Sequence, residues 1–377
     1  MSRFGKSLHQ QWDEDDESDD DDLLILDGLI EGSKRNKRKK NFRGSLPGRH
    51  SVQRGILEGN LGGGVMMVYF RDYFVDPCVY NNKHFRRRFR MSISLFLRII
   101  DAVESHDDYF CQKPNAVGAL GGSPIQKSIV AVWMLAYGVL ADFLDDYVRL
   151  GESTIIECLK HFVKAFVEVF SEQYLRAPNA EDTARLMAIN HARGWPGMLG
   201  SIDCMHWKWD KCPTAWRGAY TGHKDGPTMI LEAVASQDLW IWHTFFGLLG
   251  SLNDINVLCH SPLFQSLTSG KAPELEYIVN GNKYNICYYL ADGIYPTRAT
   301  FVKAFHSPQG NKKIYFTSAQ QVARKDVERA FGVLQSRFAM VRALRGYGVR
   351  KIVEDEREEP DFVVVYSCSV PQDTRRN

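Results

Sequence analysis

The sequence lacks the cysteine spacings that hold zinc or build a disulfide framework. None of its eight cysteines forms a C-x-x-C pair with another, and they are scattered over positions 78, 111, 158, 204, 212, 259, 287 and 368. This pattern excludes a zinc ribbon and a small disulfide-rich domain. It is typical of reduced thiols in an intracellular protein.

The sequence also lacks a long apolar run. The longest apolar stretch without charge, residues 129–141, is too short for a membrane-crossing helix, which needs about 20 residues. Residues 1–11 are polar, so no signal peptide is expected. With 44% hydrophobic and 24% charged residues, the composition is typical of a folded soluble protein, and no membrane partner is expected.

The chain has little net charge, only +2, but the charges are segregated along it. Residues 1–32 contain 11 acidic and 2 basic side chains, whereas residues 33–54 contain 9 basic and no acidic ones. Residues 111–353 contain 26 basic and 20 acidic side chains. The low sum is therefore only a weak argument against a nucleic-acid partner.

Residues 1–65 are predicted to be a disordered acidic and basic segment, because blocks of like charge repel and bury little surface. The basic run within it favours a nuclear import signal or a nucleic-acid-binding arm over a merely solvated segment. Its cations are Lys34, Arg35, Lys37, Arg38, Lys39 and Lys40. The glycine run 62–64 is the expected hinge. No strand-to-helix pattern follows it, so neither a phosphate loop nor a nucleotide cofactor is expected.

Residues 66–180 have helical periodicity and are predicted to form a helical region. One helix is predicted to start at Pro124 with Ser123 as its N-cap. A second is predicted to start at an N-cap Ser153. Its apolar side chains share one face, which consists of Ile155, Leu159, Phe162, Phe166 and Phe170.

The two helices are joined through a short turn at residues 149–152. This arrangement is compatible with a helix-turn-helix whose second helix enters a DNA major groove. Lys160 and Lys164, which point away from the apolar stripe, are then candidate DNA contacts. An ordinary helical bundle beside the rest of the folded chain is an equally good interpretation.

Cations and aromatic residues alternate between positions 83 and 90. The cations are Lys83, Arg86, Arg87, Arg88 and Arg90. Cations neutralise phosphates and rings stack on bases, so the run predicts a nucleic-acid contact. A helix with a solvated basic face would have the same pattern.

Short apolar runs rich in β-branched and aromatic residues predict strands in the second half of the chain. The predicted strands cover residues 198–202, 229–235, 239–249 and 286–291. A helix is predicted over residues 318–338, with Val327, Phe331 and Leu334 on its buried face. Residues 181–346 are therefore predicted to be a mixed α/β domain.

Acidic residues follow three of these strands, and another lies at the border of the buried face of the helix. They are Asp203, Asp254, Asp292 and Glu328. A lone aspartate after a strand is usually a turn residue or a helix cap. Four together predict a Mg²⁺ or Mn²⁺ site, because converging carboxylates need neutralising cations and oxygen ligands without cysteine favour these ions.

The segments around the four acids resemble the signature blocks of the plant PIF/Harbinger transposase-derived nucleases, which are DDE superfamily endonucleases. The blocks are Gly200–Trp207, Gly250–Leu258, Tyr289–Pro296 and Arg324–Gly332. The resemblance extends from about Tyr69 to Arg345 and includes proteins of the Antagonist of Like Heterochromatin type.

The resemblance implies an RNase H-like catalytic domain with the acidic triad Asp203, Asp292 and Glu328. The separation of 36 positions between Asp292 and Glu328 (328 − 292) suits that arrangement, and Asp254 matches a further metal ligand. The expected activity is DNA phosphodiester cleavage by a two-metal mechanism with Mg²⁺ or Mn²⁺. A Myb-like DNA-binding protein or a chromatin complex is the expected partner. The expected location is the nucleus, or the nucleus and the cytoplasm.

Basic side chains flank two of the acids. Those after Asp203 are His206, Lys208, Lys211, His223 and Lys224. They could hold DNA phosphates, although hydrogen bonding within loops is the more usual role of such a histidine. Arg324, Lys325 and Arg329 flank Glu328 and are candidate contacts to the DNA backbone, with a solvated helix face as the alternative.

The sequence departs from the family after the helix of Glu328. Residues 347–377 are expected to be a truncated or divergent tail, because a helix found in relatives is missing before the segment 352–357. Its loss would expose apolar surface. A domesticated, catalytically silent protein that binds DNA or chromatin and an inert transposon product therefore remain alternatives to an active nuclease.

Overall fold

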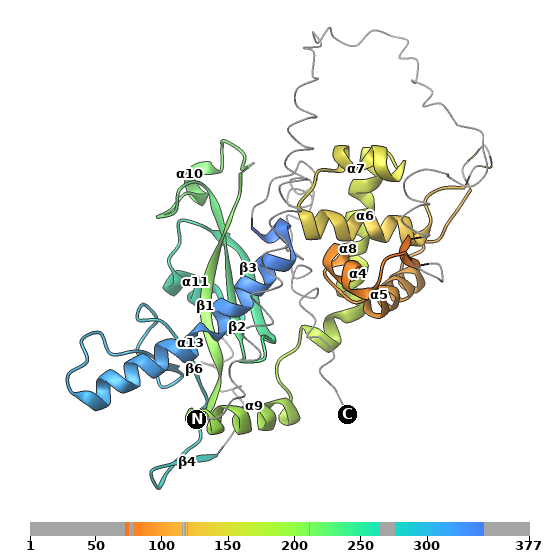
Figure 1. Ribbon diagram of the computed structural model, residues 1–377. Coiled ribbons are helices and arrows are strands. Elements are labelled where there is room, and N and C mark those ends of the chain that lie inside the picture. The colour runs from red at the N-terminus through yellow and green to blue at the C-terminus, as the bar shows by residue number, and fades with distance from the viewer. Residues whose placement is uncertain are drawn as a thin grey trace. The chain divides into compact units, whose positions relative to one another are not determined.

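The computed structural model describes residues 72–74 and 79–342, apart from residues 115, 117, 119, 211 and 264–275. These residues all belong to one compact unit, drawn in colour in Figure 1. The predictions for residues 1–65 and 347–377 lie outside the described residues. None of the helices in the described part of the chain has the length and apolar character needed to span a membrane.

Helices and strands alternate in the second half of the described chain. The helices are α4 (Asn82–Phe89), α5 (Ile93–His106), α6 (Pro124–Tyr137), α7 (Ala141–Val148), α8 (Glu152–Tyr174), α9 (Ala180–Ala192), α10 (Arg217–Tyr220), α11 (Asp254–His260), α13 (Asn311–Arg337) and the 3₁₀ helix η1 (Ala339–Val341). The strands are β1 (Met198–Lys208), β2 (Thr228–Ala235), β3 (Ile241–Leu249), β4 (Tyr277–Val279), β5 (Asn282–Tyr284), β6 (Tyr288–Leu290) and β7 (Phe301–Val302).

The start of α6 confirms the predicted cap. Ser123 Oγ accepts a hydrogen bond from the Gln126 amide (3.2 Å), and Gln126 Oε1 accepts one from the Ser123 amide (2.9 Å). Pro124 fits the first helical position because its missing N–H has no partner to lose there. The prediction for α8 is wrong by a residue or two, because this helix begins at Glu152 and Ser153 lies inside it.

The first helices pack around aromatic side chains. The predicted apolar face of α8 is buried throughout. Phe85 and Phe89 of α4 stack with their ring centroids 4.3 Å apart, and Phe89 also contacts Phe96 (5.0 Å) and Trp133 (6.1 Å). The same hydrophobic cluster includes Trp207 of β1, so the helices and the sheet share a core.

A five-stranded sheet has the strand order β3-β2-β1-β6-β7 (Figure 1). The pairs β3–β2 and β2–β1 are antiparallel, whereas β1–β6 and β6–β7 are parallel. The helices α9 and α13 contact β1, and α11 contacts β2. The predicted mixed α/β architecture is confirmed, and this strand order is compatible with an RNase H-like fold.

The central strand β1 is longer than predicted. It continues to Lys208, so Asp203 lies inside the strand opposite Ala233 of β2 and not at its end. Polar residues after Asp203 suggested a loop, but the pairing with β2 continues through them. On the other edge, β6 pairs with β1 only as far as Ser201. In the described part of the chain, no strand covers that edge of β1 from Ile202 onward.

The helix α13 is also longer than predicted, because it begins at Asn311. Its expected apolar face is confirmed, since Val327, Phe331 and Leu334 are all buried. This face brings the helix onto β1. Ser201 Oγ of β1 donates to the Ala323 carbonyl of α13 (3.1 Å).

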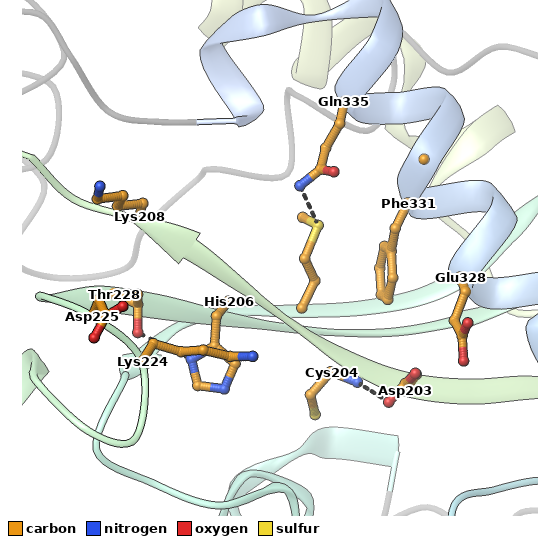
Figure 2. A pocket seen from close by; sticks show the side chains of 12 residues that line it. Asp203, Cys204, His206, Lys208, Lys224, Asp225, Thr228, Glu328, Phe331 and Gln335 are labelled. Carbon is orange, nitrogen blue, oxygen red and sulfur yellow. Dashed lines mark hydrogen bonds between the residues drawn. The ribbon is translucent and has the colours of Figure 1, made fainter.

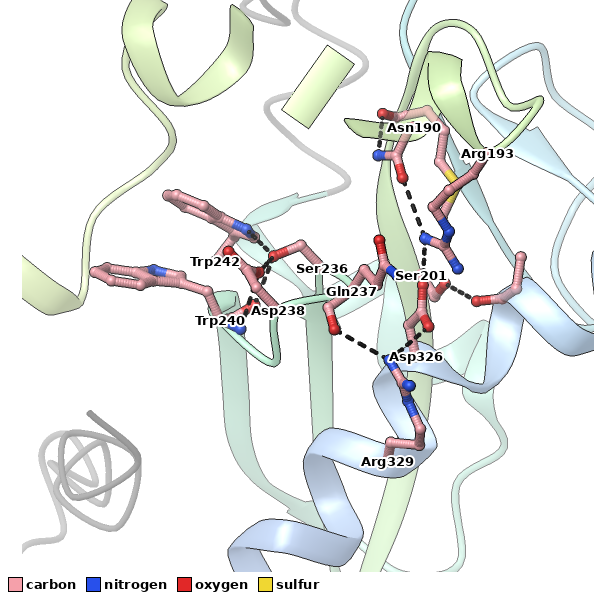
Figure 3. A network of polar contacts seen from close by, with 12 residues as sticks. Asn190, Arg193, Ser201, Ser236, Gln237, Asp238, Trp240, Trp242, Asp326 and Arg329 are labelled. Carbon is pink, nitrogen blue, oxygen red and sulfur yellow. Dashed lines mark hydrogen bonds and ion pairs between the residues drawn. The ribbon is translucent and has the colours of Figure 1, made fainter. Parts of the chain in front are cut away.

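A network of charged side chains around Asp326 fixes α13 (Figure 3). The Asp326 carboxylate, whose side chain is only 5% exposed, pairs with Arg193 at 2.7 Å and Arg329 at 2.9 Å. Arg193 also donates to Asn190 Oδ1 (3.2 Å), and Arg329 donates to the Gln237 carbonyl (3.0 Å). The network therefore links α13 to the end of α9 and to the turn between β2 and β3.

We expect Asp326→Ala to lower the free energy of unfolding by about 2–4 kcal/mol, because it leaves Arg193 without its buried partner. The exposed neighbour in Lys325→Ala is the control, with an expected change within about 0.5 kcal/mol. Urea unfolding followed by circular dichroism measures both. Equal effects of the two substitutions would show that the network contributes no stability.

Candidate active site

The four predicted acids come from four different elements. Asp203 lies inside β1, Asp254 is the first residue of α11, Asp292 follows β6, and Glu328 belongs to α13. The structure brings them within electrostatic range of one another. The charges of Asp254 and Glu328 act on Asp203, and the charge of Asp292 acts on Asp254.

Local hydrogen bonds hold the aspartates. Asp203 Oδ1 accepts from the Cys204 amide at 2.9 Å, and Asp292 Oδ1 accepts from the Ile294 amide at 2.6 Å. Asn253 caps α11 by accepting from the Asn256 amide at 2.9 Å, which fixes the first turn of that helix. Backbone amides therefore hold the carboxylates of Asp203 and Asp292, and the capped first turn of α11 places Asp254.

Negative charge is costly at this site. The pKa of Asp203 is raised to about 6, and burial is the largest cause. The Cys204 amide and Arg324 oppose the rise, and the charges of Asp254 and Glu328 add to it. Burial also raises the pKa of Asp254, with repulsion from Asp292 as the next cause. Converging carboxylates with raised pKa values are common at functional sites.

Arg324 neutralises part of this charge. Its guanidinium lies between two of the acids, with Nη1 3.2 Å from Asp203 Oδ2 and Nη2 2.9 Å from Glu328 Oε1. The Arg324 side chain is 20% exposed, so these ion pairs are only partly screened by water. Arg324, a candidate DNA contact from the sequence, is thus directed at the acids.

Gln320 supports the acidic end of the site, and the sequence analysis missed it. Its side chain is buried, and Nε2 donates to the carbonyls of Ala291 (2.9 Å) and Val302 (3.0 Å). These bonds join the ends of β6 and β7 directly before Asp292. Gln320, Arg324 and Glu328 are spaced by four residues, so they share one face of α13. A polar residue at that spacing from Glu328 was the available signal.

The half-buried Lys303 ammonium holds the loop after Asp292. Lys303 Nζ donates to the Tyr295 carbonyl (2.8 Å), to Thr297 Oγ1 (3.3 Å) and to the Gly293 carbonyl (3.4 Å). Three acceptors fix both the ammonium and the loop. Lys303 is a second supporting residue that sequence patterns alone did not indicate.

The donor set fits a hard divalent cation in its chemistry. All four acids offer oxygen ligands, and their mutual repulsion would be relieved by a bound cation. In this conformation, no three His, Cys, Asp or Glu side chains of the described residues lie close enough together to hold one ion. Arg324 supplies positive charge between Asp203 and Glu328 instead.

A groove of about 550 Å³ begins at Asp203 and Glu328 (Figure 2). It is lined by Asp203, Cys204, Met205, His206, Lys208, Lys224, Asp225, Thr228, Glu328, Phe331, Gly332 and Gln335. The predicted basic residues His206, Lys208 and Lys224 line the groove, whereas Lys211 lies outside the described residues.

His206 is a hydrogen-bonded histidine rather than a cation. Its Nδ1 lies 3.0 Å from Thr228 Oγ1, and its ring contacts that of His223 with the centroids 4.8 Å apart. The pKa of His206 is lowered to about 4, chiefly by burial and also by the nearby charges of His223 and Lys224. His206 is therefore neutral at pH 7. This agrees with the alternative of a hydrogen-bonded histidine rather than with a charged phosphate contact.

The basic run of α4 does not present its aromatic rings to a ligand. Phe85 and Phe89 are 1% and 0% exposed, so the interpretation that these rings stack on bases is wrong. Their i, i+4 spacing places both in the core instead. Lys83 and Arg86 are exposed, and none of the cations of this run lines the groove.

The other cations of the basic run at residues 83–90 are half-buried, namely Arg87, Arg88 and Arg90. The Arg90 guanidinium lies 5.3 Å from the centroid of the Tyr137 ring. A DNA contact by the cations of α4 stays a prediction.

The exposed side of α8 is more acidic than basic. Lys160 lies 3.8 Å from Glu157, and Lys164 lies 4.0 Å from Glu168. The exposed glutamates of this helix are Glu152, Glu157, Glu168 and Glu172. This charge does not favour the entry of α8 into a DNA groove, and the helix-turn-helix stays a prediction.

Of the two other cations predicted beside Glu328, one is engaged within the protein. Arg329 pairs with Asp326 and the Gln237 carbonyl in the network of Figure 3. Lys325 is exposed. Of the three cations Arg324, Lys325 and Arg329, only Lys325 could therefore contact a partner without breaking one of the ion pairs described above.

The fold and the groove define a mixed α/β protein with acids from its central strand, from the loop after a parallel strand and from a covering helix. Residues 172–355 match the family model described as plant transposon protein, which is PIF/Harbinger-like. The resemblance predicted from the four sequence blocks is confirmed by this match. Residues 69–104 match a second model, a domain of unknown function (DUF8418).

Two curated relatives carry the name "Putative nuclease HARBI1". The chain is 22% identical to the human protein and 23% identical to the bovine protein, in each case over 228 residues. The match covers 59% of this chain and 61% of each relative, so the chain spans about three fifths of their length. No solved structure matches the chain significantly.

The raised pKa of Asp203 predicts a pH-dependent effect of Asp203→Asn. Between the ordinary value of 3.8 and about 6, the folded protein retains a proton that the unfolded chain has lost. The stability from this proton is complete below pH 3.8 and is lost as the pH rises through about 6. In EDTA, the variant should therefore gain about 2–3 kcal/mol relative to wild type between pH 4 and pH 7.5.

Urea unfolding at the two pH values measures this gain, and Asp225→Asn, an exposed carboxyl of the same groove, is the control. A difference between Asp203→Asn and wild type that stays constant with pH would contradict the buried, charge-crowded environment of Asp203.

Proposed function

We propose that this chain is a transposase-derived DNA endonuclease that cuts phosphodiester bonds with the help of divalent cations. The observation that carries the proposal is the placement of Asp203 and Glu328 at one end of an open groove, with the charge of Asp254 also acting on the buried Asp203. The match to plant transposon proteins and the names of the curated relatives support the same activity.

In this proposal the sheet is an RNase H-like core, and Asp203, Asp292 and Glu328 form the catalytic triad. Asp254 is a further ligand, since its charge acts on Asp203. Bound Mg²⁺ or Mn²⁺ would supply Lewis-acid stabilisation to the attacking and leaving oxygens. At neutral pH Asp203 is mainly ionised, because its pKa is about 6.

The residues of α13 prepare the site in this proposal. Gln320 holds the strand ends before Asp292, and Arg324 balances the charge of Asp203 and Glu328 until cations bind. The ion pairs of Arg324 reduce the electrostatic repulsion in the folded, metal-free state. A cation that binds between the acids must replace this neutralisation.

A catalytically silent protein that binds DNA or chromatin is the second candidate. It is favoured by the ion pairs of Arg324, which engage both Asp203 and Glu328 and leave no three acids of the described chain grouped around one point. A Myb-like partner, nuclear import through Lys34–Lys40 and a nuclear location remain predictions with either candidate.

We expect the full-length protein to nick or cleave supercoiled plasmid DNA with Mg²⁺ or Mn²⁺, and EDTA to abolish the cleavage. Asp203→Asn and Glu328→Gln should each lower the cleavage rate by at least about 100-fold, because each removes a charge needed in the transition state. Agarose gel electrophoresis of the plasmid over time measures the rate.

Glu276→Gln is the matched control, since Glu276 is an exposed carboxyl on the separate β4–β5 hairpin. Cleavage by the Asp203 and Glu328 variants at the same rate as by the wild type would point to a contaminating nuclease. DNA binding without cleavage by the wild type would favour the silent DNA-binding protein.

A further inference from the structure

The groove of Figure 2 runs along β1, whose edge on the β6 side is uncovered beyond Ser201 in the described part of the chain. β6 pairs with β1 only up to Ser201, and no described strand pairs with that edge of β1 beyond this point. Side chains from both faces of β1 line the groove, including Met205 on the face of α13 and His206 on the opposite face. A groove that runs along a strand edge explains how both faces contribute.

The open edge also presents backbone amides. The Cys204 amide donates to Asp203 Oδ1 instead of to β2, so it points to this edge. Alternation along the strand directs the amides of His206 and Lys208 the same way. Strand-edge amides are suitable donors to phosphate oxygens.

The two ends of the groove differ in charge. Asp203 and Glu328 lie at one end, and Lys208 and Lys224 line the other. Both lysines are exposed, and Lys208 Nζ lies 3.7 Å from Asp210 Oδ1, a surface contact that a stronger anion can displace. Asp225 is an exposed acid that lines the same end of the groove. Two lysines therefore lie at this end beside the carboxylates of Asp210 and Asp225, whereas no described lysine lines the groove at the end of Asp203 and Glu328.

The length and the wall of the groove suit a nucleic-acid strand. The six residues from Asp203 to Lys208 span about 16 Å, because each of the five steps between them rises about 3.3 Å. This length corresponds to roughly five nucleotide steps of about 3.4 Å along a duplex. Phe331 and Gln335 of α13 line the opposite wall, where the half-buried Gln335 offers a side-chain amide to a bound strand.

We propose that the groove along the open edge of β1 binds the sugar–phosphate backbone of the cut DNA strand on one side of the scissile bond, with Lys208 and Lys224 as phosphate contacts. This inference rests on the proposed nuclease function and assigns a direction to the bound strand. The strand runs from the acids toward the end of β1.

DNA binding without cleavage tests the groove. The probe is a fluorescein-labelled 30-base-pair duplex of arbitrary sequence, titrated with full-length protein in EDTA at salt concentrations between 50 and 200 mM. The double variant Lys208→Gln/Lys224→Gln should bind more weakly. The slope of log K against log salt should become shallower by about 1–2, because each lost phosphate contact contributes about 0.9.

The control removes the same charge elsewhere. Lys113→Gln/Lys283→Gln changes two exposed lysines that do not line the groove, and its slope should match that of the wild type. Unchanged slopes in both double variants, or equal reductions in both, would overturn the assignment of the groove. Thermal melting of each variant verifies that it folds as the wild type does.

Plasmid cleavage by the same proteins separates this inference from the proposed function. Cleavage by the wild type together with an unchanged slope in Lys208→Gln/Lys224→Gln would overturn the groove and leave the nuclease standing. A reduced slope in that variant, with no cleavage by the wild type, would support the groove and reject the nuclease.

Discussion

The repulsion among carboxylates at one end of the groove, and its neutralisation by Arg324, is the interaction on which the site depends. Asp203 is placed on the central strand, where burial and the charges of Asp254 and Glu328 make ionisation costly. A protein gains nothing in stability from such an arrangement. The cost is consistent with a site built to hold cations, and Arg324 neutralises part of the charge of Asp203 and Glu328.

The helix α13 connects this constraint to the rest of the fold. Its apolar face packs on the sheet, while Gln320, Arg324 and Glu328 form a polar line toward the strand ends. Asp326 links the same helix to the end of α9 through Arg193, and to the turn between β2 and β3 through Arg329. The position of α13 therefore sets both the acids and one wall of the groove.

Local patterns in the sequence were sufficient for the mixed α/β architecture and the family resemblance, because motifs and apolar periodicity are local. The length of β1 was not predictable from its polar residues, since its pairing with β2 comes from a distant segment. Gln320 was missed for the same reason, because its acceptors, Ala291 and Val302, lie elsewhere in the chain. The rings of Phe85 and Phe89 were misinterpreted because burial depends on neighbours such as Trp133.

The central claim is that the acids around Asp203 form a cation site that Arg324 neutralises in the metal-free protein. Isothermal titration of Mn²⁺ into the wild type and Asp203→Asn tests it most directly, because heat of binding is recorded whether or not DNA is cut. Saturable binding by the wild type that is lost in Asp203→Asn is the predicted result. No binding by the folded wild type, or equal binding by both proteins, would contradict the account.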